Sequence, residues 1–268
     1  MWENPMISVI MGIYNCAETL EAAVECIINQ TYTNWELIMC DDCSNDDTLR
    51  VAMKLAEKDK RIIILKNKEN ITLAPSLNKS LMVARAQYTA RMDGDDLCVK
   101  DRFEKELSFL ERFPEYAMVS CQMELFDKAG TYRIISHKQE PKGKDLVYRS
   151  QFCHAGCMIR TSVMRELGGY SVNKSCQRVE DYDLWVRMYA KGYKGYNLQE
   201  PLYSMRDDRN ALNRRNFRNR LNECKVKWQV CKELRLPITN YPQIVVPIIK
   251  WLLPRAIYKF AHRMKGIS

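Results

Sequence analysis

The sequence lacks any run of about 20 consecutive apolar residues, the length that a helix needs to cross a bilayer. It also shows no basic stretch followed by an apolar one near Met1, and no internal repeat. These absences favour neither a spanning helix nor an export signal. With 268 residues, we expect one large cytoplasmic domain, or one domain with a short appendage.

Paired cysteines at the spacing of a zinc site are missing as well. Eleven cysteines are scattered along the chain, and Cys40-x-x-Cys43 and Cys153-x-x-x-Cys157 each lack a second pair. Buried thiols behave as small apolar groups, and disulfides are rare in reducing compartments. We therefore expect reduced cysteines, mostly in the core, and no structural zinc.

Positive charge is concentrated near the C-terminus. The net charge is +9, but Met205–Ser268 carries 15 Lys and Arg against 4 Asp and Glu, which leaves −2 for the rest. A near-neutral body with a basic tail indicates an anionic partner, either a membrane surface or a nucleic acid. No nucleic-acid motif accompanies the charge, so the membrane surface is the favoured interpretation.

Two hydrophobic periods alternate over the first two hundred residues. Short apolar runs predict strands at Met6–Met11, Trp35–Cys40, Arg61–Leu65, Tyr88–Met92 and Tyr116–Cys121. Apolar residues three or four apart predict helices over Leu20–Ile27, Leu49–Ala56, Pro75–Ala84 and Phe103–Leu110, and glycines end two more at Thr161–Leu167 and Asp181–Lys191. This order predicts an α/β fold with a mostly parallel sheet covered on both faces.

The character of the chain changes after Tyr203. We expect a catalytic domain over residues 1–205 and a basic, helical extension over 206–268. Leu221–Leu234 has the pattern of an amphipathic helix, and Ile244–Phe260 mixes apolar residues with cations. The extension suits the surface of an anionic membrane, at the inner face of the cell membrane. The alternative is a helix packed on the main domain or on a second subunit of a homo-oligomer.

Three acidic clusters fall where strands end or a helix begins. They are Asp41-Asp42, Asp93-Gly94-Asp95-Asp96 and Glu180-Asp181-x-Asp183. Carboxylates at the carboxyl edge of a parallel sheet can hold a hard divalent cation. Simpler roles compete with this interpretation, because acidic residues also cap helices and are stabilised at helix N-termini.

These clusters belong to a set of motifs that resembles bacterial glycosyltransferase family 2, with the GT-A (Rossmann-like) fold. The resemblance covers about residues 6–205. Its motifs are Ile7-Ser-Val-Ile-Met-Gly-Ile-Tyr-Asn15, Cys40-Asp-Asp-Cys-Ser-Asn-Asp-Asp-Thr48, Ser76-Leu-Asn78, Ala90-Arg-Met-Asp-Gly-Asp-Asp96, Asp101-Arg-Phe-Glu104 and Glu180-Asp-Tyr-Asp-Leu-Trp185.

The resemblance implies roles for individual residues. Tyr14, Asn15, Asp42, Arg91 and Asp93 would form the donor site, with Asp42 on the uracil edge. Asp95 would be the principal ligand of Mn²⁺ or Mg²⁺, with Asp93 beside it. Asp181 would be the general base, and Glu180 would position the base or the acceptor. Without the resemblance, a helix N-terminal acid would be the better interpretation of Asp181.

The predicted reaction follows from these roles. A divalent cation stabilises the leaving nucleotide, while a carboxylate on the opposite face of the sugar takes the acceptor proton, so one displacement inverts the anomeric centre. We expect transfer of a single sugar from a UDP-sugar to an acceptor hydroxyl, on a lipid-linked intermediate of a bacterial surface polysaccharide. The alternatives are a sugar nucleotidyltransferase and a nucleic-acid-binding protein that uses the basic tail.

The sequence departs from the family pattern in two places. Asn70-Ile71-Thr72 lacks a common glycine, and Asp208 stands where many members have a histidine, so the third metal ligand is left open. Arg206, Arg209 or Arg214 would contact the diphosphate, or form a solvated basic stretch. The Gln-x-x-Arg-Trp motif of processive synthases is absent, which favours addition of one sugar. His154, Trp185 and Met188 are expected in the core, with an acceptor-site role as the alternative for His154.

Overall fold

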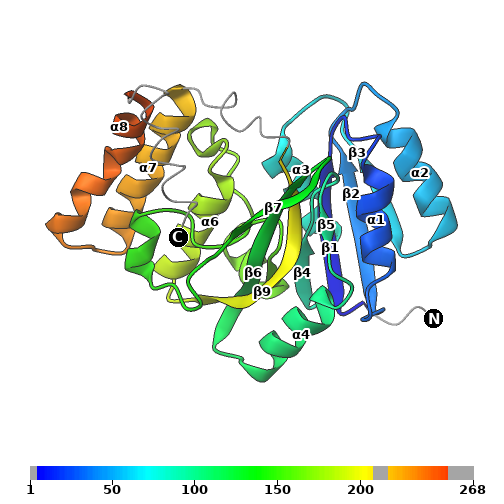
Figure 1. Ribbon diagram of the computed structural model, residues 1–268, viewed down its shortest axis with the longest axis horizontal. Helices are drawn as coiled ribbons and strands as arrows, with labels where there is room; N and C mark the ends of the chain where they lie inside the picture. The colour runs from blue at the N-terminus through cyan, green and yellow to red at the C-terminus, as the bar shows by residue number, and fades with distance from the viewer. Residues whose placement is uncertain (1–4, 208–216, 253–268) are drawn as a thin grey trace.

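The computed structural model describes residues 5–207 and 217–252, and the strands in this part form one nine-stranded sheet (Figure 1). The strands are β1 (Ile7–Ile13), β2 (Trp35–Asp41), β3 (Ile62–Lys66), β4 (Tyr88–Arg91), β5 (Leu97–Cys98), β6 (Tyr116–Asp127), β7 (Gly130–Ile135), β8 (Met158–Arg160) and β9 (Lys194–Arg206). The α-helices are α1 (Leu20–Ile28), α2 (Thr48–Lys58), α3 (Leu73–Val83), α4 (Arg102–Arg112), α5 (Thr161–Glu166), α6 (Glu180–Ala190), α7 (Phe217–Glu233) and α8 (Val246–Leu252). Short 3₁₀ segments are η1 (Gly143–Val147), η2 (Lys174–Cys176) and η3 (Ile238–Ile244).

The sheet has a parallel half and a mixed half. Its order is β3-β2-β1-β4-β8-β6-β9-β5, with β7 beside β6. The strands β3, β2, β1 and β4 are parallel, as predicted, and their bounds agree with the predicted runs to within two residues. Beyond β4, the strand β8 is antiparallel to both of its neighbours, β9 runs parallel to β6, and β5 is antiparallel to β9. The expectation of a mostly parallel sheet therefore holds for the N-terminal half.

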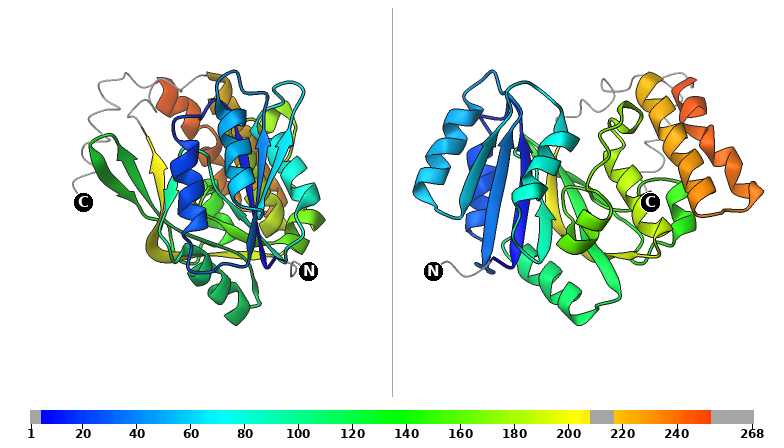
Figure 2. Two further views of the ribbon diagram at one scale, coloured as in Figure 1. Left: turned by 90° about the vertical axis from the view of Figure 1, so that its right-hand side faces the viewer. Right: turned by 180° about the vertical axis from the view of Figure 1, so that it is seen from behind.

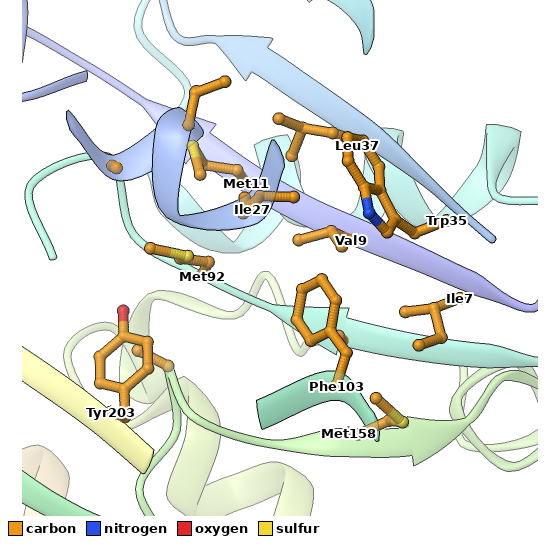
Figure 3. Packing of buried hydrophobic residues seen from close by; sticks show 14 of the residues in the cluster. Ile7, Val9, Met11, Ile27, Trp35, Leu37, Met92, Phe103, Met158 and Tyr203 are labelled. Carbon is orange, nitrogen blue, oxygen red and sulfur yellow. The ribbon is translucent and has the colours of Figure 1, made fainter. Parts of the chain in front are cut away.

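Alternate residues of β1 enter two different cores, because successive side chains of a strand point to opposite faces. Ile7, Val9 and Met11 pack with the apolar faces of α1, α2 and α4 (Figure 3). Ile10 faces the second core, which contains Leu77 of α3 and residues of α6. Trp185 and Met188 are fully buried there, as predicted. The sheet is therefore covered on both faces.

The helices α7 and α8 lie side by side beyond α6, at the end of the molecule away from α1 and α2 (Figures 1 and 2). The amphipathic pattern at Leu221–Leu234 is confirmed as α7, which buries Val226, Val230 and Cys231 in the second core. Within the described residues, no helix is long and apolar enough to cross a membrane. Residues 253–260 of the predicted interfacial segment lie outside the described part of the chain. The domain boundary expected after residue 205 stays a prediction.

Candidate functional site

Two adjoining cavities open at the carboxyl end of β1. The larger has a volume of about 600 Å³ and the smaller of about 390 Å³, and Gly12 and Tyr14 line both. A Cβ at Gly12 would lie 2.7 Å from Cδ1 of Leu73, so a larger residue at this strand end would require the Leu73 side chain to shift. The larger cavity contains Asp42 and Glu180, and the smaller contains Asp93 and Asp95.

The acidic cluster after β4 has the geometry of a cation site. One carboxylate oxygen from each of Asp93, Asp95 and Asp96 lies within 4.8 Å of the others. Oxygen ligands about 2.0–2.6 Å from one divalent ion have separations of this size. Asp96 is the addition to the predicted pair. Its Oδ2 accepts from the Tyr203 hydroxyl at 2.8 Å, and its Oδ1 accepts from the Arg206 N–H at 2.7 Å.

Electrostatics support the same fit. Burial, together with the charges of Asp93 and Asp95, raises the pKa of Asp96 to about 8. Three crowded carboxylates disfavour one another's ionised form, and a divalent cation would relieve that repulsion. The donor set therefore fits Mn²⁺ or Mg²⁺, with Asp93, Asp95 and Asp96 as the residues that would hold it.

Arg91 is buried behind this cluster. Its Nη2 lies 2.6 Å from Oδ1 of Asp93, and its side chain is only 4% exposed. Burial by itself would lower the pKa of Arg91, but the neighbouring Asp93 carboxylate raises it above its ordinary value. Arg102, from the Asp101-Arg-Phe-Glu104 motif, donates to the Arg91 carbonyl at 3.0 Å. Arg91 thus orients Asp93, and its predicted place in the donor site stays a prediction.

Asp42 accepts hydrogen bonds from the loop before α3. Its Oδ1 accepts from the Ile71 N–H at 2.9 Å and from Asn67 Nδ2 at 2.8 Å, and its Oδ2 accepts from the Thr72 N–H at 2.8 Å. The carboxylate therefore shapes the loop that lacks the family's glycine, and Thr72 there has a φ of +75°. A uracil contact would use lone pairs that these bonds leave open.

Tyr14 and Asn15 project from the loop after β1. Tyr14 is 46% exposed, and Asn15 has a left-handed φ of +50°, which asparagine tolerates better than most residues. The Asn45 N–H donates to Asn15 Oδ1 at 2.9 Å. Asp46 accepts from the Thr48 N–H at 3.0 Å and from the Ala17 N–H at 3.2 Å, but the N-cap of α2 is Asp47, whose side chain makes no capping hydrogen bond. The second motif thus fixes the loop that presents Tyr14 to both cavities.

Glu180 and Asp181 form the first turn of α6, and both are half-buried. Burial, and then the charge of Glu180, raises the pKa of Asp181 to about 6. The hydroxyl of Ser150 donates to Oδ2 of Asp181 at 3.3 Å. A carboxylate with a raised pKa, next in sequence to the cavity-lining Glu180, suits proton abstraction. Asp183, the third acid of the cluster, instead pairs with Arg187 at 2.7 Å.

Several functional features were not predicted from the sequence. The motif that contains Asp96 predicts metal ligands at Asp93 and Asp95 alone. Ser150 and the segment 171–178, which lines the larger cavity, carry no sequence signal. The Ser76-Leu-Asn78 motif explains the last of these. Asn78 bonds both the N–H and the carbonyl of Tyr170 at 2.8 Å, which fixes the start of that segment against α3.

The remaining predicted residues have mixed outcomes. His154 Nε2 lies 3.0 Å from the Tyr170 hydroxyl, and its ring packs edge-on against Trp185, which agrees with the core interpretation. Arg206 lines the smaller cavity and its Nε donates to the Asp95 carbonyl. Asp208, Arg209 and Arg214 lie outside the described residues.

Comparisons with known proteins agree with this architecture. The structure of residues 1–349 of S. aureus TarS in complex with UDP superimposes with a TM-score of 0.69, over 91% of this chain and 70% of that one, at 16% identity. This similarity shows that the fold is GT-A, with its mixed sheet and flanking helices. At that identity it carries the fold alone.

Sequence comparisons show the family. Putative glycosyltransferase EpsE of Bacillus subtilis is 42% identical over 271 residues, covering 100% of this chain and 97% of that protein. The UDP-Glc:alpha-D-GlcNAc-diphosphoundecaprenol beta-1,3-glucosyltransferase WfaP of Escherichia coli is 31% identical over 192 residues, covering 72% and 73%. Neither the nucleotidyltransferase nor the nucleic-acid alternative gains support from them. The family model "Glycosyl transferase family 2" matches residues 8–168. The chain belongs to glycosyl transferase family 2.

Proposed function

We propose that this glycosyltransferase is a metal-dependent, inverting enzyme that transfers one sugar from a UDP-sugar to an acceptor hydroxyl. One observation carries the proposal. Two of the three carboxylates that fit a divalent cation, Asp93 and Asp95, line one cavity. Glu180 of the Glu180–Asp181 pair lines the next, and the two cavities meet at Gly12 and Tyr14. A nucleotide diphosphate and an acceptor can thus be bound on the two sides of one reacting carbon.

The proposed roles follow from position and charge. Asp93, Asp95 and Asp96 would hold the cation, which when bound supplies electrostatic stabilisation of the leaving diphosphate. Asp181 takes the acceptor proton as the acceptor oxygen attacks, and a single in-line displacement inverts the anomeric centre. Ser150 orients Asp181, and Tyr14 and Asp42 contact the nucleoside.

A screen for released UDP tests the proposal. The full chain is incubated with a panel of UDP-sugars and Mn²⁺ or Mg²⁺, with and without a chelator. We expect UDP release from at least one donor and its loss, by about 10²-fold or more, when the metal is removed, because charge on the leaving group is then uncompensated. Undiminished turnover in excess chelator would contradict metal dependence.

The acceptor is proposed from the relatives and from charge. WfaP is named for a diphosphoundecaprenol acceptor, and a membrane lipid of this class requires an enzyme that reaches the membrane surface. The basic composition of residues 205–268 suits an anionic surface. Val245, Ile249 and Leu252 follow one another at helical spacing and are 48%, 52% and 67% exposed. We propose that this stripe, near the start and along α8, rests on the inner face of the cell membrane.

Flotation with vesicles tests the membrane contact. Replacing both Ile249 and Leu252 with glutamate should weaken binding of the full chain to anionic vesicles by about tenfold or more, because apolar burial is lost and negative charge is added. The matched control is Met82→Glu, at an 81% exposed position of α3. Equal flotation of all three proteins would show that α8 does not touch lipid.

A further inference from the structure

Three positively charged side chains line the larger cavity and have no part in the proposed reaction. Lys174 and Arg178 belong to the segment between α5 and α6, and Arg218 belongs to the first turn of α7. All three side chains are exposed and can move to meet a ligand. Asp42 and the first turn of α3 line the same cavity. Arg218 lies 40 positions after Arg178 and 44 after Lys174, so two separate parts of the chain bring positive charge to one space.

The fold fixes the backbone that carries Lys174 and Arg178. Asn222 of α7 donates from Nδ2 to the Gln177 carbonyl at 3.0 Å, which ties the segment to the helix that carries Arg218. Cys176 and Val179 are buried on either side of that contact. Arg178 lies between them with a φ of +68°, a conformation that side-chain-bearing residues seldom adopt. Anchored neighbours therefore fix where Arg178 and Lys174 enter the cavity.

The acidic residues of the described lining do not offset this charge in full. They are Glu180 and Asp42, and the Asp42 carboxylate already accepts three hydrogen bonds from Asn67, Ile71 and Thr72. Lysine and arginine side chains bind phosphate oxygens through charge-assisted hydrogen bonds, and arginine does so through two parallel N–H groups. The cavity is thus suited to a phosphate or diphosphate.

The place of these cations within the cavity indicates which substrate carries that group. Asp93 and Asp95, which would hold the cation for the donor diphosphate in the proposed function, line the smaller cavity. The larger cavity contains Asp42 with the first turn of α3, where the nucleoside is proposed, and also Glu180, beside the proposed base Asp181, where the acceptor hydroxyl has to lie. Lys174 and Arg178 belong to the segment that leads directly into Glu180, which places them on the acceptor's part of this cavity. We propose that Lys174, Arg178 and Arg218 bind the diphosphate that links the acceptor sugar to its lipid. This inference rests on the proposed function.

Binding to a soluble acceptor analogue tests the inference without requiring turnover. The full chain is saturated with UDP and Mg²⁺ and titrated with GlcNAc-diphosphate carrying a short alkyl chain, or with the alkyl glycoside of GlcNAc that lacks the diphosphate. We expect the diphosphate compound to bind at least tenfold more tightly. Arg178→Ala and Arg218→Ala should each remove most of that difference, and the Kd for UDP should stay the same.

The matched control is Lys225→Ala, which removes an exposed cation of α7 outside the cavity lining. It should change neither affinity. Equal binding of the two analogues to the wild type would overturn the inference. A lower affinity for UDP in Arg178→Ala or Arg218→Ala would also overturn it, because the cations would then bind the donor. Absence of UDP release from every donor in the presence of metal would count against the proposed function. The affinities above are measured with no transfer, so the two failures can be told apart.

Discussion

Replacing Asp95 with alanine should lower the rate of sugar transfer by about 10³-fold, which corresponds to about 4 kcal/mol of lost transition-state stabilisation. Asp95 is the exposed member of the cluster and lines the cavity proposed for the donor diphosphate. Without it, the remaining carboxylates hold a cation less firmly and at a changed position. Steady-state UDP release at saturating donor, with Mn²⁺ varied, measures the effect.

Metal binding separates this explanation from a folding defect. In the presence of UDP, the affinity for Mn²⁺ should fall in the variant, while the affinity for UDP in excess chelator should stay unchanged. Asp47→Ala is the matched control, because Asp47 is 63% exposed and makes only a surface ion pair with Arg50, which contributes little to stability. Unaltered Mn²⁺ affinity in Asp95→Ala would show that the ion is held elsewhere.

The parallel half of the fold could be predicted because its strands are continuous apolar runs. All of β2 and almost all of β1 are buried, so their sequences are mostly apolar, with Ser8, Glu36 and Asp41 as the polar exceptions. The mixed half gives no such signal. β5 has two residues and β8 three, and β9 contains polar and charged residues along an exposed stretch. Their pairing is decided by tertiary contacts, which a local pattern does not contain.

The candidate site shows the same division. Carboxylates at strand ends could be located from the sequence, because the ends of neighbouring parallel strands meet at one edge. The third carboxylate of the cation site was harder to assign, since Asp96 is oriented by Tyr203 and by the Arg206 N–H, both 107 residues or more away. The segment 171–178 reaches the cavity through Asn78 and Asn222, which lie on two other helices.

The motifs also mix two kinds of residue that sequence alone does not separate. Arg102 is fully buried and supports the Arg91 carbonyl, and Asn78 fixes Tyr170, so both serve the site through the backbone. Asp42, which is proposed to contact the nucleoside, also fixes the backbone of the loop at Ile71 and Thr72. A motif therefore locates a site more reliably than it assigns contact with the substrate.

Replacing Asp181 with asparagine should lower the rate of transfer by about 10²–10⁴-fold, the usual range for the loss of a general base. Asparagine keeps the size of the side chain and its bond to Ser150, but it cannot take a proton. The affinities for UDP and Mn²⁺ should stay close to those of the wild type, because the proposed metal ligands Asp93 and Asp95 line a different cavity from the one that Glu180 lines. Single-turnover kinetics with saturating donor measures the chemical step.

Asp47→Asn is the isosteric control and should transfer sugar at the wild-type rate, since its surface pair with Arg50 lies at the start of α2. A full rate in Asp181→Asn would show that another group accepts the proton. Glu180→Gln provides an intermediate test, because it removes the neighbouring charge and leaves the base in place. We expect this substitution to change mainly the pH dependence of kcat/KM.

The pH profile distinguishes a base from a merely structural acid. Because burial and Glu180 raise the pKa of Asp181 to about 6, the carboxyl is protonated and inactive below that pH. The acid limb of kcat/KM should therefore fall about tenfold per pH unit below about pH 6. Glu180→Gln stabilises the ionised form of Asp181, lowers its pKa and should move this limb to lower pH. A limb that stays in place would mean that the group titrating near pH 6 is not coupled to Glu180, and so is not the neighbouring Asp181.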